Sequence, residues 1–174
     1  MDFLKPIKDQ IPDYAKDIRL NIDSVLSRSS LDQADALGAA LAAAYAAKSK
    51  FLIDAIRGSG LLSEGDINAA LTAAALMGMN NVWYPYVEMA GDDDLSTQRA
   101  ELRMNAYATH GGVEKRRFEL FALSASAIGK CHFCIGSHYK LLKEIGMTVV
   151  QLRDVGRIAA VIGAAAQVLA AEGV

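Results

Sequence analysis

Apolar residues recur at three- and four-residue spacings along most of this chain, and no segment alternates between apolar and polar residues as a β-strand does. Residues at these spacings share one face of an α-helix. The segment 12–28 shows the pattern clearly, with apolar side chains at Tyr14, Ile18, Ile22, Val25 and Leu26. The periodicity therefore predicts an all-α fold.

Helix-start signals divide the chain further. Ser30 with Gln33 and Thr148 with Gln151 match the capping box, in which a hydroxyl residue is followed three positions later by Glu or Gln. Ser63 is a third candidate cap. We expect helices over 12–28, 30–48, 50–57, 63–79, 96–107, 113–129, 131–145 and 148–171. The aromatic segment 80–86 around its proline is expected to pack in the core or in an interface.

The length of 174 residues indicates a single domain over 1–174. A weak internal repeat relates residues of approximately 30–83 to those of 113–170, and both halves contain a hydroxyl cap followed by an apolar residue four positions on. In this alignment Lys48 and Phe51 fall where Cys131 and Cys134 stand. The repeat predicts two weakly similar helical halves packed against each other.

Composition and charge exclude several classes of protein. A net charge of −2 does not suit a nucleic-acid-binding surface. The chain contains no run of about 18 uninterrupted apolar residues, so no membrane span is expected. The acid and the proline among the first six residues argue against a signal peptide. We therefore expect a cytoplasmic protein, in which thiols are kept reduced. The 52% apolar content predicts surplus apolar surface for a subunit interface.

The segment 130–138 contains both cysteines and two of the three histidines. On a helix, Cys131 and Cys134 are neighbours, at a separation that suits a disulfide. His138 follows Cys134 by four residues, so its imidazole is expected one turn from that sulfur. A helix N-terminus and a nearby imidazolium both favour the thiolate form of cysteine. The spacing predicts a reversible dithiol/disulfide centre in which His138 carries the proton.

Glu119 is the best candidate for a carboxylate that orients His138, although the pattern leaves open whether it is buried there or lies on the surface. A zinc site is an alternative, with Cys131, Cys134 and His138 as ligands. His132 is the nearest fourth ligand, but on a helix it projects away from Cys134. Two inert buried cysteines are a second alternative. His110, in the loop 109–112, is expected to be exposed.

The sequence around this site resembles the AhpD family of alkyl hydroperoxide reductase proteins, a branch of the carboxymuconolactone decarboxylase-like superfamily. The resemblance is carried by Glu119, by the segment Cys131-His132-Phe133-Cys134 and by His138. The segments 12–18, 77–82 and 102–105 also match, so the resemblance spans nearly the whole chain.

The resemblance implies an AhpD-like helical bundle that assembles as a homotrimer. It also implies that Cys134 is the less exposed, deprotonated cysteine, served by His138 and Glu119. Cys131 is then the accessible cysteine that engages the partner, and His132 is expected to assist. No tightly bound cofactor and no metal are expected.

The implied activity is that of an antioxidant thiol–disulfide oxidoreductase and peroxidase. Dihydrolipoamide, on a lipoyl-carrying protein, reduces the disulfide. The dithiol then reduces a partner peroxiredoxin of the AhpC-like kind, and weakly reduces alkyl hydroperoxides directly. A carboxymuconolactone decarboxylase-like enzyme and a non-catalytic, zinc-stabilised helical module are the alternative functions.

Overall fold

The computed structural model describes all residues, 1–174, and contains helices but no strands, which confirms the all-α prediction. The α-helices are α1 (Leu4–Asp9), α2 (Lys16–Ser27), α3 (Gln33–Ala46), α4 (Lys50–Arg57), α5 (Glu64–Ala90), α6 (Asp93–Ser96), α7 (Asn105–Ala108), α8 (Lys115–Gly129), α9 (His132–Glu144) and α10 (Val149–Ala171). Two short 3₁₀ helices, η1 (Asp13–Ala15) and η2 (His110–Gly112), precede α2 and α8.

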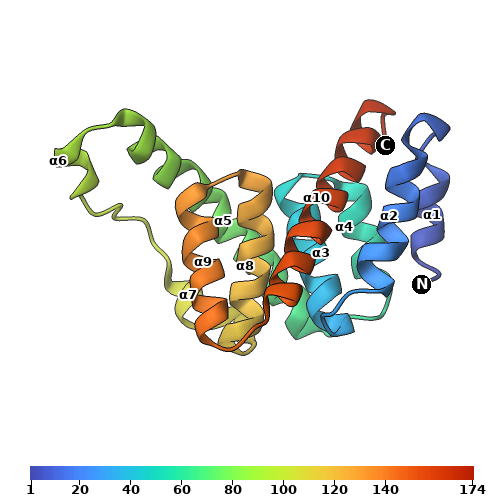
Figure 1. Cartoon of the computed structure of the whole chain (residues 1–174), viewed down its shortest axis with the longest axis horizontal. Helices are drawn as coiled ribbons and strands as arrows, with labels where there is room; N and C mark the ends of the chain where they lie inside the picture. The colour runs from blue at the N-terminus through green and yellow to red at the C-terminus, as the bar shows by residue number, and fades with distance from the viewer.

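Helix α3 lies at the centre of the bundle. It packs against α5, α8 and α10, and α9 lies outside α8 while α1 and α2 cover the opposite end (Figure 1). Every residue of α3 from Asp35 to Ala44 is buried. The helix is rich in alanine because its neighbours approach from all sides. At Gly38, even a methyl group would overlap the ring of Phe121.

The start of α3 differs from the expected one. Asp32, rather than Ser30, caps the helix by accepting a hydrogen bond from the Asp35 amide at 2.8 Å. Ser30 instead donates its amide and its hydroxyl to Asp154, at 2.8 and 2.9 Å. The caps expected at Ser63 and Thr148 are confirmed, and Thr148 forms a complete capping box.

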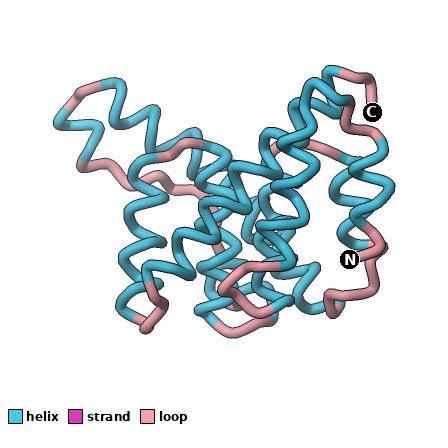
Figure 2. Tube along the Cα trace, turned by 45° about the vertical axis from the view of Figure 1, so that its right-hand side comes forward, coloured by secondary structure: helices cyan, strands magenta, loops and turns pink.

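Helix α5 extends well past its expected end. It continues beyond Met79, through Pro85, to Ala90, and stops at Gly91 in the left-handed conformation. The helix expected over 96–107 is wrong, since only the short α6 and α7 form there. Residues 91–104, here called the arm, are mostly exposed and project away from the bundle (Figures 1 and 2). Without a face to bury, that segment lacks the packing that stabilises most helices.

The two cysteines have counterparts in the other half of the chain. Ser49 caps α4 by accepting a hydrogen bond from the Leu52 amide, and the Cys131 sulfur caps α9 by accepting one from the Cys134 amide. The two halves also share an order of helices, in which α3, α4 and α5 of the first half correspond in turn to α8, α9 and α10 of the second.

This correspondence differs by one residue from the alignment made on sequence. Lys48 and Lys130 both have left-handed backbones, with φ of 60° and 55°, and each directly precedes a cap. The structure therefore pairs Ser49 with Cys131, where the sequence alignment placed Lys48. The boundaries of the repeat remain a prediction.

Helix α10 has the length and apolar composition of a membrane span, and 44% of its most apolar stretch is buried inside the protein. It packs against α2, α3 and α8. Core helices commonly have this composition, and the buried face accounts for the apolar residues of α10.

Replacing Gly111 with alanine is expected to destabilise the fold by about 1–3 kcal/mol. Gly111 has φ +61°, and a Cβ there would lie 2.6 Å from the Cα atom of Ala69 on α5. Chemical denaturation measures the effect. Gly112→Ala is the matched control, since Gly112 has φ +95° but no atom near its would-be Cβ. An equal loss in both variants would show that the close contact with α5 is unimportant.

Asp154 is expected to make stability depend on acid. Its side chain is 2% exposed, and it accepts hydrogen bonds from Ser30, Arg153 and Arg157. Burial raises the pKa of Asp154, but these donors outweigh burial and hold it well below its usual range. The stabilisation is therefore present at neutral pH and is lost as the pH falls below about 4 towards the folded-state pKa.

Asp154→Asn should cost about 1.5–3 kcal/mol at pH 7, the usual contribution of hydrogen bonds to a charged group. Its deficit against the wild type should narrow as the pH is lowered from 7 to 3, measured by denaturant unfolding. Asp23→Asn, which removes a half-exposed partner of Lys8, is the control and should cost less than about 1 kcal/mol. A deficit that stays constant with pH would contradict the role of the carboxylate charge.

Candidate active site

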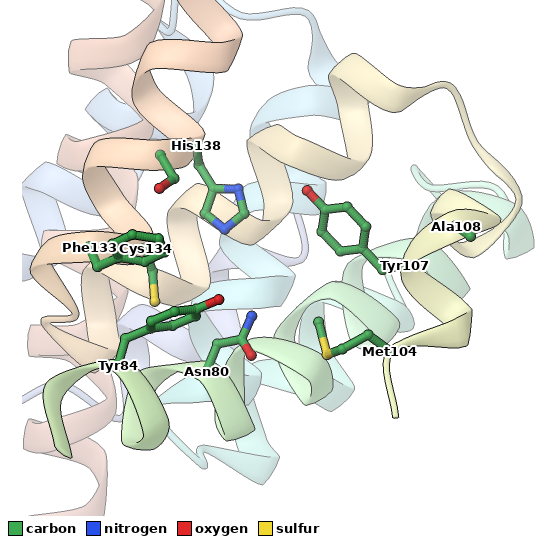
Figure 3. A pocket seen from close by; sticks show the side chains of 9 residues that line it. Asn80, Tyr84, Met104, Tyr107, Ala108, Phe133, Cys134 and His138 are labelled. Atoms are coloured by element: carbon green, nitrogen blue, oxygen red, sulfur yellow. The ribbon is translucent and has the colours of Figure 1, made fainter. Parts of the chain in front are cut away.

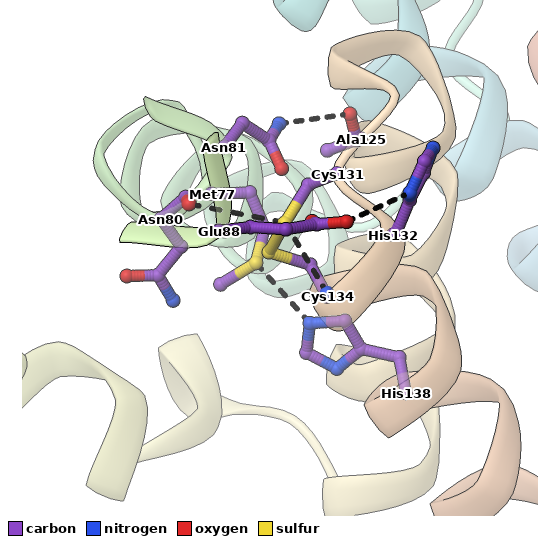
Figure 4. The surroundings of a disulfide bond; sticks show 9 residues. All are labelled: Met77, Asn80, Asn81, Glu88, Ala125, Cys131, His132, Cys134 and His138. Atoms are coloured by element: carbon purple, nitrogen blue, oxygen red, sulfur yellow. Dashed lines mark hydrogen bonds and ion pairs between the residues drawn. A yellow bond between two sulfur atoms is a disulfide. The ribbon is translucent and has the colours of Figure 1, made fainter. Parts of the chain in front are cut away.

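A disulfide joins Cys131 and Cys134 at the start of α9, with their Cα atoms 5.3 Å apart (Figure 4). Helix α8 ends at Gly129, and the left-handed backbone of Lys130 turns the chain directly into the next helix. Cys131 is the capping residue of α9, and Cys134 lies on its first turn. The pairing agrees with the one expected from the spacing.

Both cysteines are buried in this disulfide form, with exposed fractions of 0% for Cys131 and 3% for Cys134. The expectation that Cys131 is the more accessible cysteine is therefore wrong for this form of the single chain. Helix α5 packs against this cysteine, and its Asn80 carbonyl oxygen lies 3.9 Å from the Cys131 sulfur. Cys134, in contrast, lines a pocket.

Glu119 and His138 form a buried pair between α8 and α9. The Glu119 Oε2 atom lies 2.6 Å from the His138 Nδ1 atom, and Glu119 has no exposed surface. A buried carboxylate needs such partners to offset the loss of hydration. The structure thus resolves what the sequence left open, since Glu119 is buried and reaches the imidazole.

The partners of Glu119 keep it ionised. Burial raises its pKa, but hydrogen bonds from His138 and from the Tyr107 hydroxyl outweigh burial and lower it. A carboxylate can only accept, so Nδ1 of His138 carries a hydrogen and Nε2 of the neutral ring is the free acceptor. Nε2 faces the Met77 sulfur at 3.2 Å, and a thioether is a weak partner. This nitrogen is therefore available to take up a proton.

A pocket of about 350 Å³ opens beside Cys134 and His138 (Figure 3). Most of its lining is apolar. The rings of Tyr84 and Phe133 stack at 4.1 Å, and Met104 and Tyr107 form the wall on the side of α7. A small apolar substrate bound there would meet the sulfur of Cys134 and the imidazole together.

Sequence reasoning missed two residues of this site, Tyr107 and Met77. Met77 lies in the segment 77–82, which is part of the family resemblance, but the resemblance assigned no role to this residue. Tyr107 follows the matching segment 102–105 and was assigned to an ordinary helix. Its contact with Glu119 depends on how α7 folds back onto α8, and local sequence does not show this.

His132 lies on the far side of α9 from His138 (Figure 4). It is 81% exposed, and its Nδ1 atom lies 3.4 Å from Glu88 Oε1 on the extension of α5. The structure does not bring it to Cys134, where the resemblance suggested that it assists. His110 is also not the exposed side chain expected, since it is half-buried and its ring lies 5.9 Å from that of Phe118.

The zinc alternative finds no support in the arrangement of the side chains. No group of three or more His, Cys, Asp or Glu residues is placed to hold a metal ion. The two histidines considered as ligands contact different carboxylates, Glu119 and Glu88, on different sides of α9.

The fold and the site together define a class of protein, an all-helical domain with a C-x-x-C disulfide backed by a buried histidine–glutamate pair. A family model described as the carboxymuconolactone decarboxylase family matches residues 93–174, which include both cysteines, Glu119 and His138.

Longer matches identify the branch. A protein of Rhodospirillum centenum named alkyl hydroperoxide reductase AhpD is 45% identical over 171 residues, which cover 97% of this chain and 91% of the relative. A protein of the same name from Rhizorhabdus wittichii is 42% identical, covering 95% and 96%, and one from Coxiella burnetii is 41% identical with the same coverage. The chain belongs to the alkyl hydroperoxide reductase AhpD family.

Proposed function

We propose that the protein is an antioxidant thiol–disulfide oxidoreductase that reduces alkyl hydroperoxides through Cys131 and Cys134. The observation that carries the proposal is a disulfide whose Cys134 lines an apolar pocket, next to an imidazole whose free nitrogen can take up a proton. Its relatives in the family are named alkyl hydroperoxide reductases.

The oxidative half of the cycle begins with the reduced pair. Nε2 of His138 takes the proton of the Cys134 thiol, and the thiolate attacks one oxygen of the hydroperoxide. The O–O bond breaks, the alcohol leaves with that proton, and Cys134 becomes a sulfenic acid. The Cys131 thiol then attacks the Cys134 sulfur, the S–O bond breaks, and water leaves as the disulfide forms. Two electrons pass from the cysteine pair to the peroxide.

We propose dihydrolipoamide, carried on a lipoyl protein, as the reductant, with no tightly bound cofactor. One of its thiols attacks the disulfide to form a mixed disulfide, and its second thiol releases the cysteine pair in the reduced form. The same exchange, run on a partner disulfide, would pass the electrons to an AhpC-like peroxiredoxin. The family name supports a role within an alkyl hydroperoxide reductase system.

We further propose a homotrimer located in the cytoplasm. The extension of α5 supports self-association, because Val82, Tyr86 and Met89 lie at helical spacing along it and are 56–80% exposed. Apolar side chains exposed in a row commonly mark an interface. The number of protomers follows from the family resemblance, and light scattering should give three times the chain mass of 18.6 kDa.

Trapping the cysteine pair during turnover tests the proposed function. The protein is mixed with dihydrolipoamide and an alkyl hydroperoxide, quenched with an alkylating reagent, and analysed by mass spectrometry. The dithiol should accumulate with reductant alone, and the disulfide should return within one peroxide addition. A cysteine pair that stays in one state throughout would refute the proposal. A decarboxylase or lactone-processing activity that survives in a double cysteine variant would favour the alternative function.

A further inference from the structure

We propose that Tyr107 is a positioning residue that fixes the Glu119 carboxylate against His138 and so sets the pH range in which the cysteine pair reacts. This inference rests on the proposed function, because it concerns the proton relay of the same site. The evidence is the way in which the two oxygens of Glu119 are shared.

Each oxygen of the Glu119 carboxylate has its own donor. Oε1 accepts a hydrogen bond from the Tyr107 hydroxyl, and Oε2 accepts one from His138 Nδ1 at 2.6 Å. Glu119 has no exposed surface, so it depends on these two side chains for its hydrogen bonds in the folded protein. A carboxylate held at both oxygens cannot rotate about its bond to the side chain, and the imidazole bonded to it is oriented as a result.

Tyr107 is itself held in place by packing. Its ring meets the ring of Phe118 edge-on, with centroids 5.5 Å apart and an interplanar angle of 88°. The ring of His110 lies on another side at 6.4 Å. The hydroxyl points from α7 towards His138, across the pocket that contains Cys134 (Figure 3). The bond to Glu119 is therefore a fixed part of the fold.

The charges around Glu119 give the direction of the effect. The groups that act on it are His138 on α9, Tyr107 on α7 and Lys115 on α8, while Tyr84 on α5 acts on Tyr107. Burial and the neighbouring carboxylate strongly raise the pKa of Tyr107, so the hydroxyl keeps its hydrogen and remains a donor. This donor also helps to lower the pKa of Glu119.

Removal of the hydroxyl would leave Glu119 with His138 as its single hydrogen-bond donor. The carboxylate would then hold a proton more tightly, so the Glu119–His138 pair would become protonated at a higher pH. A protonated pair places an imidazolium beside Cys134, and an imidazolium favours the thiolate form of a cysteine. The acid limb of the pH–rate profile for thiol reactivity should accordingly move to lower pH.

The test measures how the rate of thiol alkylation depends on pH in the reduced, full-length protein, with iodoacetamide as the probe. In Tyr107→Phe, which keeps the ring that packs on Phe118, the acid limb should move down by about one pH unit. At neutral pH, peroxide turnover should fall about tenfold, because an imidazolium that holds its proton more tightly donates it less readily to the leaving alcohol. Tyr14→Phe is the matched control, because the Tyr14 hydroxyl donates to Glu172 at 2.7 Å on the surface, and it should not move the limb.

A double-variant comparison tests whether Tyr107→Phe shifts the acid limb through the Glu119 carboxylate. In a Glu119→Gln background, Tyr107→Phe should cause no further shift of the acid limb. A Tyr107→Phe protein that melts at a lower temperature but keeps the wild-type pH profile would overturn the inference, as would a shift that persists in the Glu119→Gln background. Alkylation of the chemically reduced protein needs neither peroxide nor dihydrolipoamide, so absence of peroxide turnover in the wild type would refute the proposed function alone.

Discussion

Replacing either cysteine with serine should abolish the catalytic reduction of alkyl hydroperoxide by dihydrolipoamide. Serine cannot form the disulfide that the cycle regenerates, and a hydroxyl is not ionised at neutral pH. The two single variants should nevertheless fail at different steps, because the proposed mechanism gives the cysteines different roles.

Cys131→Ser retains the attacking sulfur at Cys134 but lacks the sulfur that resolves the sulfenic acid. It should consume one equivalent of peroxide per chain and then stop, with the sulfenic acid trapped by a nucleophile such as dimedone and detected by mass spectrometry. Cys134→Ser should consume none. The reverse pattern would show that Cys131 attacks the peroxide, and full turnover in either variant would rule out the cycle.

His138→Gln should slow peroxide reduction by about 10²–10⁴-fold at neutral pH, the usual contribution of general acid–base catalysis. Glutamine can form hydrogen bonds but cannot take up the proton of Cys134. A cysteine thiol without a base beside it ionises at about pH 8.5. The loss of kcat/KM in the variant should therefore shrink as the pH is raised beyond that value. The measurement is kcat/KM between pH 6 and 9.

The control for His138 is its neighbour on the same helix. His132→Gln removes an exposed imidazole that contacts Glu88, and its effect on kcat/KM should be much smaller. Equal losses in the two variants would contradict the placement of the relay on the buried side of α9. A His138→Gln protein with full activity at pH 7 would refute the relay itself.

Features of the fold that depend on interactions between residues close in the sequence could be predicted, and features that depend on distant residues could not. Caps such as Ser63 and Thr148 act within four residues, so the sequence located the helices that they begin. The end of α5 was missed because Pro85 reads as a helix breaker, while the helix in fact continues through it to Gly91. Ser30 was misread because its partner, Asp154, lies in a distant part of the chain.

The candidate site divides in the same way. Helical spacing brought Cys131, Cys134 and His138 together from sequence alone, since all three belong to one helix start. Glu119 required the packing of α8 on α9, and the sequence supplied only a candidate. Tyr107 comes from a segment with little regular structure, and its contact with Glu119 arises from the tertiary fold.

The correspondence between Ser49 and Cys131 means that the first half of the molecule shows which residue can replace Cys131 in the second half. Serine already occupies the equivalent capping position on α4, where its oxygen performs the task that the Cys131 sulfur performs on α9. Cys131→Ser therefore substitutes a residue that this architecture already accepts at the head of a helix. Inactivity of that variant can accordingly be attributed to the missing chemistry of sulfur, with the local backbone left intact.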